Sequence, residues 1–502
     1  MAIIRLKRTR NSLLNVSRLP PEILGEIFRF NTAPRAVLIA SAVKRSHNFL
    51  LVCHHWFKVA SRTPELWSFW GHTVQDWTKR YLQYPTAPLD LVHDDGQFDF
   101  TTFTFDEGLR NALRDRAARD SIREIRLTIG DSGIMNFMIS LLTNREQTRS
   151  SRMESVVLRF VNPHEPPIVL DFLASYRLPK LRCLHLENCT IPSWSPKTSV
   201  LTTLSLDGGF PSPMITSSQL LSVLRSNPRL QEIVLGRCAV PDDGGDKSSR
   251  VPLAHLTNLM LTGRPQHVFT LLRQLKYPRT MDNLFLDLVD SAVEDIPGAI
   301  GPYLRNYFRR RGRSQSGLGL ELSFHDNMEL EFWIKVTSDL SDPYLETFPP
   351  FARIFIHLGQ MLPEDLSDEG LLDLIAHVPR EEITSFRAND IPISAHVISA
   401  QFPSLSGLHF QDTPLHIAFP RSNLGRSRIF PCLQHFRIAV GDAVLMRRSD
   451  WDPLTTFLDR LASSGNRLNT LVIDGHYVMH PKVEGRIRRA VRELRMTDGS
   501  EY

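Results

Sequence analysis

The sequence predicts a mixed α/β fold, in which a short helical unit precedes a long array of strand–helix units with parallel strands inside and helices outside. Three observations predict it. Residues 19–28 carry apolar side chains at helical spacing. An apolar pattern, L-x-x-L-x-L, then recurs about ten times along the chain. Stretches with helical periodicity lie between its copies.

The first expected helix begins at the proline pair of residues 20–21. Proline is tolerated in the first turn of a helix, where its missing amide proton would have no partner anyway. Ile23 and Ile27 are four residues apart, as are Leu24 and Phe28, so this helix has one broad apolar face. Residues 36–43 and 48–61 are also helix-compatible. Three helices this short bury little core, so the unit needs a partner or a neighbouring domain.

Three sub-motifs follow one another in this region: LPPEILGEIF at 19–28, LLVCHHWF at 50–57 and TPELW at 63–67. In this order they resemble an F-box of the fungal, basidiomycete-like type, over about residues 17–70. The segment 30–48 is longer than in the shortest F-boxes, which leaves the limits of the second helix open. The resemblance implies a three-helix domain that binds a Skp-type adaptor and, through it, the cullin of a ubiquitin ligase.

The resemblance also implies which side chains contact the adaptor, because in F-boxes these come from the L-P-x-E-I-L stretch and the third helix. Several of them could instead form only the small domain's own core, foremost Ile27, Phe28 and Trp56. Trp67 and Trp70 are expected to join this domain to the rest of the chain. Carried over by motif, the adaptor-binding residues are Leu19, Pro20, Ile23, Leu24, Ile27, Phe28, Val52, Cys53 and Trp56.

The clearest copy of the repeated pattern is Leu181, Leu184 and Leu186. The last two apolar positions of each copy alternate with polar ones, which predicts a short strand with one buried face. Expected helices lie at 218–226, 267–275, 370–377 and 452–463. Further copies begin at residues 201, 230, 256, 281, 405, 433 and 468, and weaker ones at 122 and 153.

A strand followed by a helix, repeated in this way, resembles a leucine-rich-repeat solenoid, in which stacked repeats share one core. The repeats are irregular in length, and residues 291–380 are either degenerate repeats, with strands at 318–324 and 352–358, or a small inserted domain. The expected organisation is a basic flexible N-terminus (1–16), the F-box (17–70), a linker with the first solenoid elements (71–120), irregular repeats (121–480), and a capping helix over 481–496 with a tail to residue 502.

In such a solenoid, the residues between the buried leucines face the concave surface, where a protein target could bind. Both charge signs, histidines and apolar groups occur there, which suits a protein better than a polyanion. The alternative is that these are solvated strand positions, since few interface residues carry binding energy. Cys189 and Cys238 follow the strands and are interpreted as structural. The candidate target-binding residues are His185, Glu187, Ser205, Glu232, Met260, Phe285, His409, His435 and Arg437.

Composition narrows the class of protein. The net charge is +5, while two clusters, at residues 5–10 and 305–313, supply nine positive charges, so the rest of the chain is slightly acidic. Either cluster could be a nuclear import signal, a nucleic-acid patch, or a solvated tail or loop. Five cysteines without a C-x-x-C pair indicate a reducing compartment, the cytosol or the nucleus. No apolar run is long enough for a membrane helix.

No phosphate-binding, metalloprotease or nucleophile-elbow motif occurs in the sequence. We therefore expect a chain without enzymatic activity, cofactor or metal. The resemblance implies the substrate-recognition subunit of a Skp–cullin–F-box ubiquitin ligase. The alternatives are a leucine-rich-repeat scaffold that acts outside a cullin ligase and, more remotely, a nucleic-acid-associated protein.

Overall fold

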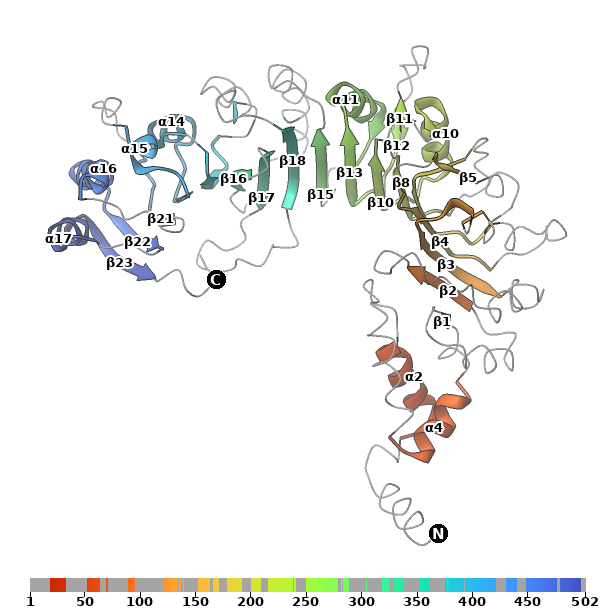
Figure 1. Ribbon diagram of the computed structural model, residues 1–502. Helices are drawn as coiled ribbons and strands as arrows, with labels where there is room; N and C mark the ends of the chain where they lie inside the picture. The colour runs from red at the N-terminus through yellow and green to blue at the C-terminus, as the bar shows by residue number, and fades with distance from the viewer. Residues whose placement is uncertain are drawn as a thin grey trace, which may run out of the picture. The chain divides into compact units, whose positions relative to one another are not determined.

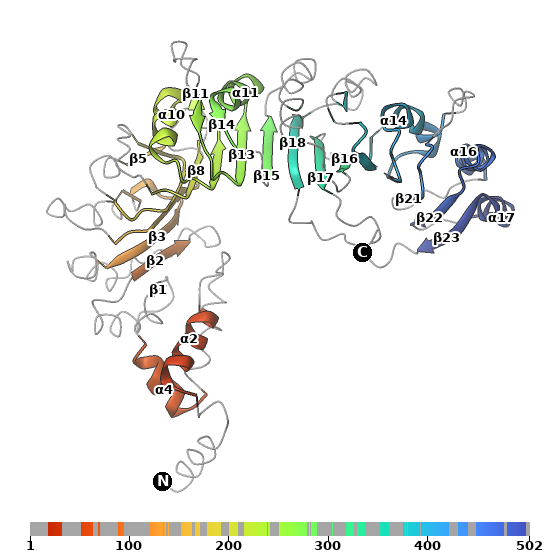
Figure 2. The same cartoon turned by 180° about the vertical axis from the view of Figure 1, so that it is seen from behind.

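The computed structural model confirms a mixed α/β protein with parallel strands and, among its described residues, eight α-helices (Figures 1 and 2). The chain divides into two compact units: Met1–Glu232 with Cys238–Gly245, and Ile233–Arg237 with Asp246–Tyr502. The structure describes residues 19–32, 52–63, 69–70, 89–94, 121–133, 135–136, 139, 152–162, 166–170, 178–191, 200–208, 215–237, 239–240, 250–278, 281, 283–288, 304, 318–325, 329–336, 352–360, 375–376, 378, 380–391, 393–420, 430–439, 448–475 and 479–497.

The first unit begins with helices α2 (Pro21–Thr32) and α4 (His54–Ser61). Helix α2 begins within the proline pair, as predicted. Helix α4 begins later than the predicted 48–61, because Cys53 is extended and its sulfur caps the helix by accepting the Trp56 N–H at 3.5 Å. Val52 and Cys53 therefore precede the helix on which we placed them. The expected helix at 36–43 and residues 48–51 lie outside the described residues.

Parallel strands follow in the first unit, each hydrogen-bonded to the next. Their apolar positions stand in rows: Leu127, Leu158, Leu186 and Leu206 are register neighbours and all are buried. Trp70 lies on β1 beside β2, and Trp67 lies outside the described residues. The main strands are β1 (Phe69–Trp70), β2 (Leu89–Asp94), β3 (Ile122–Ile129), β4 (Ser155–Phe160), β6 (Cys183–Glu187) and β8 (Thr203–Asp207).

Short strand pairs and one helix complete the first unit. Strand β5 (Ile168–Val169) pairs with β7 (Cys189–Thr190), and β9 (Ile215–Thr216) pairs with β11 (Ala239–Val240). Helix α10 (Ser217–Ser226) agrees with the expected 218–226 and begins with a capping box formed by Thr216 and Gln219.

The second unit holds a longer sheet that is parallel except at one strand, β17 (Glu329–Val336). This strand is antiparallel to both of its neighbours, β16 (Leu318–His325) and β18 (Ala352–Gln360). The strands predicted at 318–324 and 352–358 are thus present, with an unpredicted strand between them. The order of the sheet is β13 (Asn258–Gly263), β15 (Asn283–Leu288), β18, β17, β16, β19 (Ile383–Asn389), β20 (Gly407–Gln411), β21 (His435–Ala439), β22 (Leu468–Asp474) and β23 (Val491–Thr497).

The helices of the second unit that follow the sheet's later strands lie along one side of β21–β23, as both views show (Figures 1 and 2). Strand β10 (Glu232–Gly236) and the pair β12 (Val251–Pro252) and β14 (Leu275–Lys276) complete the strands. No helix among the described residues is both long and apolar enough to cross a membrane. The helices are α11 (Pro265–Gln274), α14 (Ala395–Gln401), α15 (Leu415–Ala418), the 3-10 helix η6 (Arg448–Trp451), α16 (Asp452–Ser463) and α17 (Pro481–Ala490).

A turn of one geometry recurs where strands end. The residue after the strand has a positive φ, as at Asn188, Arg237, Asp390 and Asp412, or is a glycine, Gly475. Its N–H then donates to a carbonyl at the end of the neighbouring strand. This turn holds adjacent strands in one register. The bonds are Asn188 to Asp207 (2.9 Å), Arg237 to Thr262 (2.8 Å), Asp390 to Gln411 (2.8 Å), Asp412 to Ala439 (3.0 Å) and Gly475 to Thr497 (3.2 Å).

A second recurring turn precedes the strands. The first leucine of the L-x-x-L-x-L pattern donates its N–H to the carbonyl three residues before it, as Leu181 does to Leu178 at 3.2 Å. The same bond joins Leu230 to Asn227, Leu256 to Leu253, Leu405 to Phe402 and Leu433 to Phe430. Proline or alanine follows the acceptor residue in each of these turns. The repeated sequence pattern therefore corresponds to a repeated backbone conformation.

Phenylalanine side chains form the core between the last strands and their helices. The Phe419 ring lies 4.7 Å from that of Phe457, 5.6 Å from that of Phe410 and 5.8 Å from that of Phe436, measured between centroids. Phe430 packs on Phe457 at 6.1 Å. All five are almost fully buried, so they act as one packed cluster.

The expected capping helix over 481–496 is wrong in its second half. Helix α17 ends at Ala490, and the chain continues as β23, which pairs with β22. Val483 and Ile487 are buried on the helix, whereas Val491 and Leu494 belong to the strand. The edge of β22 supplies backbone hydrogen-bond partners for this strand. Helical periodicity of the sequence does not reveal that such a partner is present.

Candidate functional site

The nine predicted adaptor residues divide into a buried and an exposed set. Leu24 and Phe28 are 0% and 1% exposed and form the domain's own core, where the Phe28 and Trp56 rings lie 5.1 Å apart. Ile23 and Ile27 are 49% and 39% exposed, although they share the same helix. The remaining residues are exposed (Pro20, and Val52 at 54%) or half-buried (Leu19, Cys53 and Trp56).

Close packing of α2 against the end of α4 explains this division. A Cβ at Gly25 would stand 3.3 Å from the Thr63 hydroxyl, which itself donates to the Val59 carbonyl at 3.0 Å. The Gly25 side of α2 is thus taken up by α4, which leaves Ile23 and Ile27 to solvent. Phe57 is also exposed, at 36%. It was not among the predicted adaptor residues, although it is the last residue of the LLVCHHWF motif.

We call Ile23, Ile27, Val52 and Phe57 the N-terminal apolar set. Seven large apolar side chains are exposed in the part of the chain that the structure describes, and four of them belong to this set. Scattered exposed apolar residues are ordinary, but these four lie on or just before two short helices. The N-terminal apolar set is therefore the candidate interaction surface of this part of the chain.

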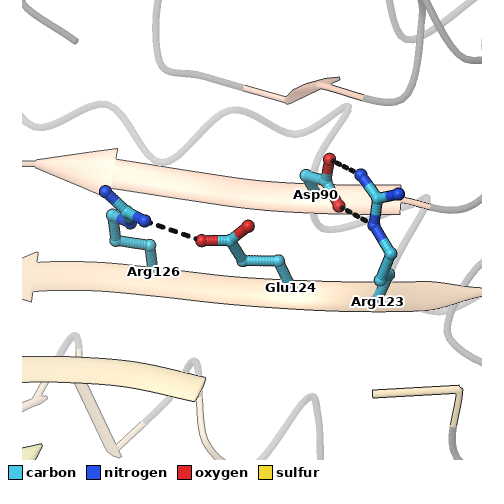
Figure 3. A network of polar contacts seen from close by, with 4 residues as sticks. All are labelled: Asp90, Arg123, Glu124 and Arg126. Carbon is cyan, nitrogen blue, oxygen red and sulfur yellow. Dashed lines mark hydrogen bonds and ion pairs between the residues drawn. The ribbon is translucent and has the colours of Figure 1, made fainter. Parts of the chain in front are cut away.

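On the sheet of the first unit, the polar positions carry paired charges. Arg123 donates from Nε and Nη2 to the two carboxylate oxygens of Asp90, at 3.0 and 2.6 Å, and Arg126 donates to Glu124 at 2.8 Å (Figure 3). Asp90 is 3% exposed, and its burial raises the pKa of its carboxyl group although Arg123 opposes this. The pairs leave this part of the sheet with its charges compensated.

Three predicted target residues, His185, Glu187 and Ser205, lie on two neighbouring strands of the first unit. His185 and Ser205 are register neighbours on β6 and β8, and Glu187 ends β6. The Nε of Arg159 on β4 donates to His185 Nε2 at 3.1 Å and lies 3.6 Å from Glu187. Burial, and then the charges of Arg159 and Arg126, lower the pKa of His185 to about 4. His185 is therefore neutral at pH 7 and accepts from Arg159.

Acid is expected to destabilise the first unit through His185. The pKa of a histidine is about 6.5 in an unfolded chain, whereas that of folded His185 is about 4. Below pH 6.5 the unfolded chain binds a proton that the folded chain excludes, so the free energy of unfolding falls until the pH nears 4. His185→Gln should reduce the change in the free energy of unfolding between pH 7 and pH 4.5, because glutamine can still accept from Arg159 but does not titrate. Urea unfolding at the two pH values measures this change. Equal pH dependence in the two proteins would contradict the assignment.

The remaining target residues are distributed among several strands. Met260 and Phe285 are half-buried register neighbours on β13 and β15, whereas Glu232 lies on β10. His409 and Arg437 are register neighbours on β20 and β21. His435 is exposed and stands in a different row, between Gly407 and Thr470. The structure thus pairs some predicted residues and leaves others apart.

Arg387 is a functional candidate that the sequence analysis missed. It lies on β19 and is the register neighbour of His409 on the side opposite Arg437. Its strand carries the pattern Ile383, Phe386 and Ala388, in which alanine takes the place of the last large apolar residue. An allowance for alanine at that position would have identified this copy.

Cys189 has the structural role predicted for it. Its thiol is buried and donates to the Glu187 carbonyl at 3.3 Å, and burial raises its pKa to about 12. Thr413 takes the corresponding place after β20 and donates to the Gln411 carbonyl at 3.2 Å. Both small polar side chains therefore satisfy backbone inside the turn. Cys238 lies outside the described residues.

The part of the chain that the structure describes holds no group of three or more histidine, cysteine, aspartate or glutamate side chains that could bind a metal ion. No protein-family model matches the chain, and no curated protein matches it significantly.

Proposed function

We propose that this chain is the substrate-recognition subunit of a Skp–cullin–F-box ubiquitin ligase. Residues 17–70 act as an F-box that binds a Skp-type adaptor, and the strand–helix repeats form a leucine-rich-repeat solenoid that binds a protein target. The chain carries out no chemistry itself. It holds a target lysine near a conjugating enzyme that other subunits supply, so its contribution is proximity.

The observation that carries the proposal is the exposure of the N-terminal apolar set within the LPPEIL and LLVCHHWF motifs. Ile23, Ile27 and Val52 are between 39% and 54% exposed and lie at positions that the resemblance assigns to the adaptor. The recurring turns before and after the strands support the solenoid, because stacked repeats require one conformation at equivalent positions.

We expect Ile23→Asp to weaken binding of a recombinant Skp-type adaptor at least about tenfold, because a charge placed in an apolar contact loses both packing and hydration. Calorimetric titration of the purified full-length chain with the adaptor measures this. Since Ile23 is half-exposed and contributes little to the core, circular dichroism and thermal unfolding should remain unchanged.

Val169→Asp is the matched control, because Val169 on β5 is 51% exposed and lies outside the N-terminal apolar set. It should leave adaptor binding unchanged. Equal binding by wild type and Ile23→Asp would refute the assigned surface. Adaptor bound without cullin in a pull-down from cells would instead favour a scaffold that acts outside a cullin ligase.

A further inference from the structure

Strand β23 is the last strand of the second unit's sheet, as both views show (Figures 1 and 2). Among the described residues, β22 is the only strand that pairs with it. A strand at the edge of a sheet presents backbone N–H and C=O groups that another strand can satisfy. The outer edge of β23 is therefore a surface on which a further strand can pair.

The hydrogen bonds to β22 show which backbone groups of β23 face outward. Gly475 donates its N–H to the Thr497 carbonyl at 3.2 Å, so the backbone of Thr497 faces β22. Successive residues of a paired strand direct their N–H and C=O groups to alternate sides. Counting back from Thr497, the outward-facing groups belong to Arg492, Leu494 and Met496.

The buried apolar rows of the sheet also end at this strand. Leu494 is the register neighbour of Leu471, and Met496 is that of Ile473. Leu471 and Ile473 are fully buried and have strands on both sides, whereas Leu494 is half-buried and Met496 is 42% exposed. A further strand at this edge removes apolar surface from water.

The order of side chains along β23 is complementary to itself. When two copies pair antiparallel about Leu494, Glu493 of each copy stands opposite Arg495 of the other, and Arg492 stands opposite Met496. A pair centred on Arg492, on Glu493 or on Arg495 instead places that residue opposite its own copy, and like charges directly opposite are destabilising. The charges therefore select the register centred on Leu494.

The two charged residues can form these cross-strand pairs without losing their present contact. Within one chain, Arg495 Nε donates to a Glu493 carboxylate oxygen at 2.8 Å, and both side chains are about half-exposed. A carboxylate has two acceptor oxygens and a guanidinium has five N–H donors, so each can bind a second partner. A second copy thus extends each ion pair into a network of four alternating charges.

Helix α17, which precedes β23, turns a charge-compensated flank away from α16. Arg486 donates to Asp459 of α16 at 2.6 Å, so this flank of α17 faces α16. Each residue advances a helix by about 100°, so Glu484 and Arg488, each two residues from Arg486, lie on the opposite flank. Arg488 donates to Glu484 there at 2.8 Å. A second α17 beside this flank meets no excess of either charge.

We propose that the outer edge of β23 binds a second copy of this chain, antiparallel and centred on Leu494. Leu494 pairs with its own copy and Arg492 pairs with Met496 on either side, which gives about six backbone hydrogen bonds between the copies. The contact is isologous and uses both free edges, so association stops at the dimer. This pairing needs neither an adaptor nor a target, so it does not rest on the proposed function.

Sedimentation velocity of the purified full-length chain tests the pairing. We expect the sedimentation coefficient to rise from that of a monomer toward that of a dimer between about 1 and 100 µM. Arg492→Pro should weaken association at least about tenfold, because proline removes an outward-facing N–H that the pair requires. The variant should fold, since Val491 before it has φ −121° and ψ 160°, which suit the residue before a proline.

Two charge reversals test the register. Glu493→Arg places arginines opposite each other and Arg495→Glu places acids opposite each other, so each variant alone should self-associate at least about tenfold more weakly than wild type. An equimolar mixture of the two should form a dimer, because every cross-strand pair then joins an acid to an arginine. A loss of folding in either variant cannot produce this recovery.

Lys276→Glu is the matched control, because Lys276 is an exposed cation on a short strand of the same unit, away from β23. It should leave association unchanged, and so should Ile23→Asp in the N-terminal apolar set. A wild-type chain that stayed monomeric at about 100 µM would refute the proposal. Dimers unaffected by Arg492→Pro would place the contact elsewhere, and a mixture that failed to dimerise would overturn the antiparallel register.

Discussion

Replacing Phe419 by alanine is expected to lower the free energy of unfolding of the second unit by about 3–5 kcal/mol, as for other buried aromatic residues. Phe419 is 1% exposed, and its ring lies within 5.8 Å, centroid to centroid, of those of Phe410, Phe436 and Phe457. Alanine leaves a cavity in the centre of this cluster, since the strands and α16 hold the neighbouring rings in place. The shift of the urea unfolding midpoint of the full-length chain measures the loss.

Phe419→Leu should cost clearly less than Phe419→Ala, because leucine refills part of the space. Val161→Ala is the surface control: Val161 is 37% exposed and its truncation should stay within about 0.5 kcal/mol of wild type. A Phe419→Ala variant as stable as Val161→Ala would mean that the ring cluster does not hold this part of the unit together.

Replacing Arg437 by methionine is expected to lower the free energy of unfolding by about 3 kcal/mol, because it leaves the Asp474 carboxylate without its cation. The two side chains are 11% and 10% exposed, so water cannot replace the lost partner fully. The Thr497 hydroxyl still donates to Asp474 but carries no charge. Urea unfolding at pH 7 gives the loss.

The double variant, Arg437→Met with Asp474→Asn, should recover most of that stability, since no buried charge remains and an asparagine oxygen can still accept from Thr497. Comparison of Arg437→Met alone and Asp474→Asn alone with the double variant isolates the interaction between the two charges. If the double variant were as unstable as Arg437→Met, lost packing of the arginine stem, not an isolated carboxylate, would be the cause.

Much of the secondary structure followed from residue spacing. Helix α16 spans Asp452–Ser463, the predicted range, and β6 lies in the clearest copy of the leucine pattern. Strand β17 was not predicted, because its antiparallel place between β16 and β18 depends on partners on both sides. Strand β23 was mistaken for helix because Val483, Ile487, Val491 and Leu494 also fit helical periodicity.

The candidate sites, like the secondary structure, were predicted only in part from residue spacing. Motif spacing identified Ile23, Ile27 and Val52, which the structure leaves exposed, but it could not separate them from Leu24 and Phe28, which the packing of α2 on α4 buries. In the second unit, His409 and Arg437 were candidates from their strand positions alone. Arg387 joined them only when register placed β19 beside β20.

Local spacing decides which side chains of a strand or helix share a face, since that depends only on the backbone conformation of a few neighbouring residues. The sequence could therefore determine which leucines of each strand are buried, whereas their alignment into rows needed the register between strands. The cap of α10 is likewise local, because Thr216 and Gln219 are three residues apart. Only the tertiary structure could decide which charges meet. Arg437 and Asp474 are 37 residues apart, and Arg123 and Asp90 are 33 apart, so each pair forms only after backbone hydrogen bonds between distant strands have set the register.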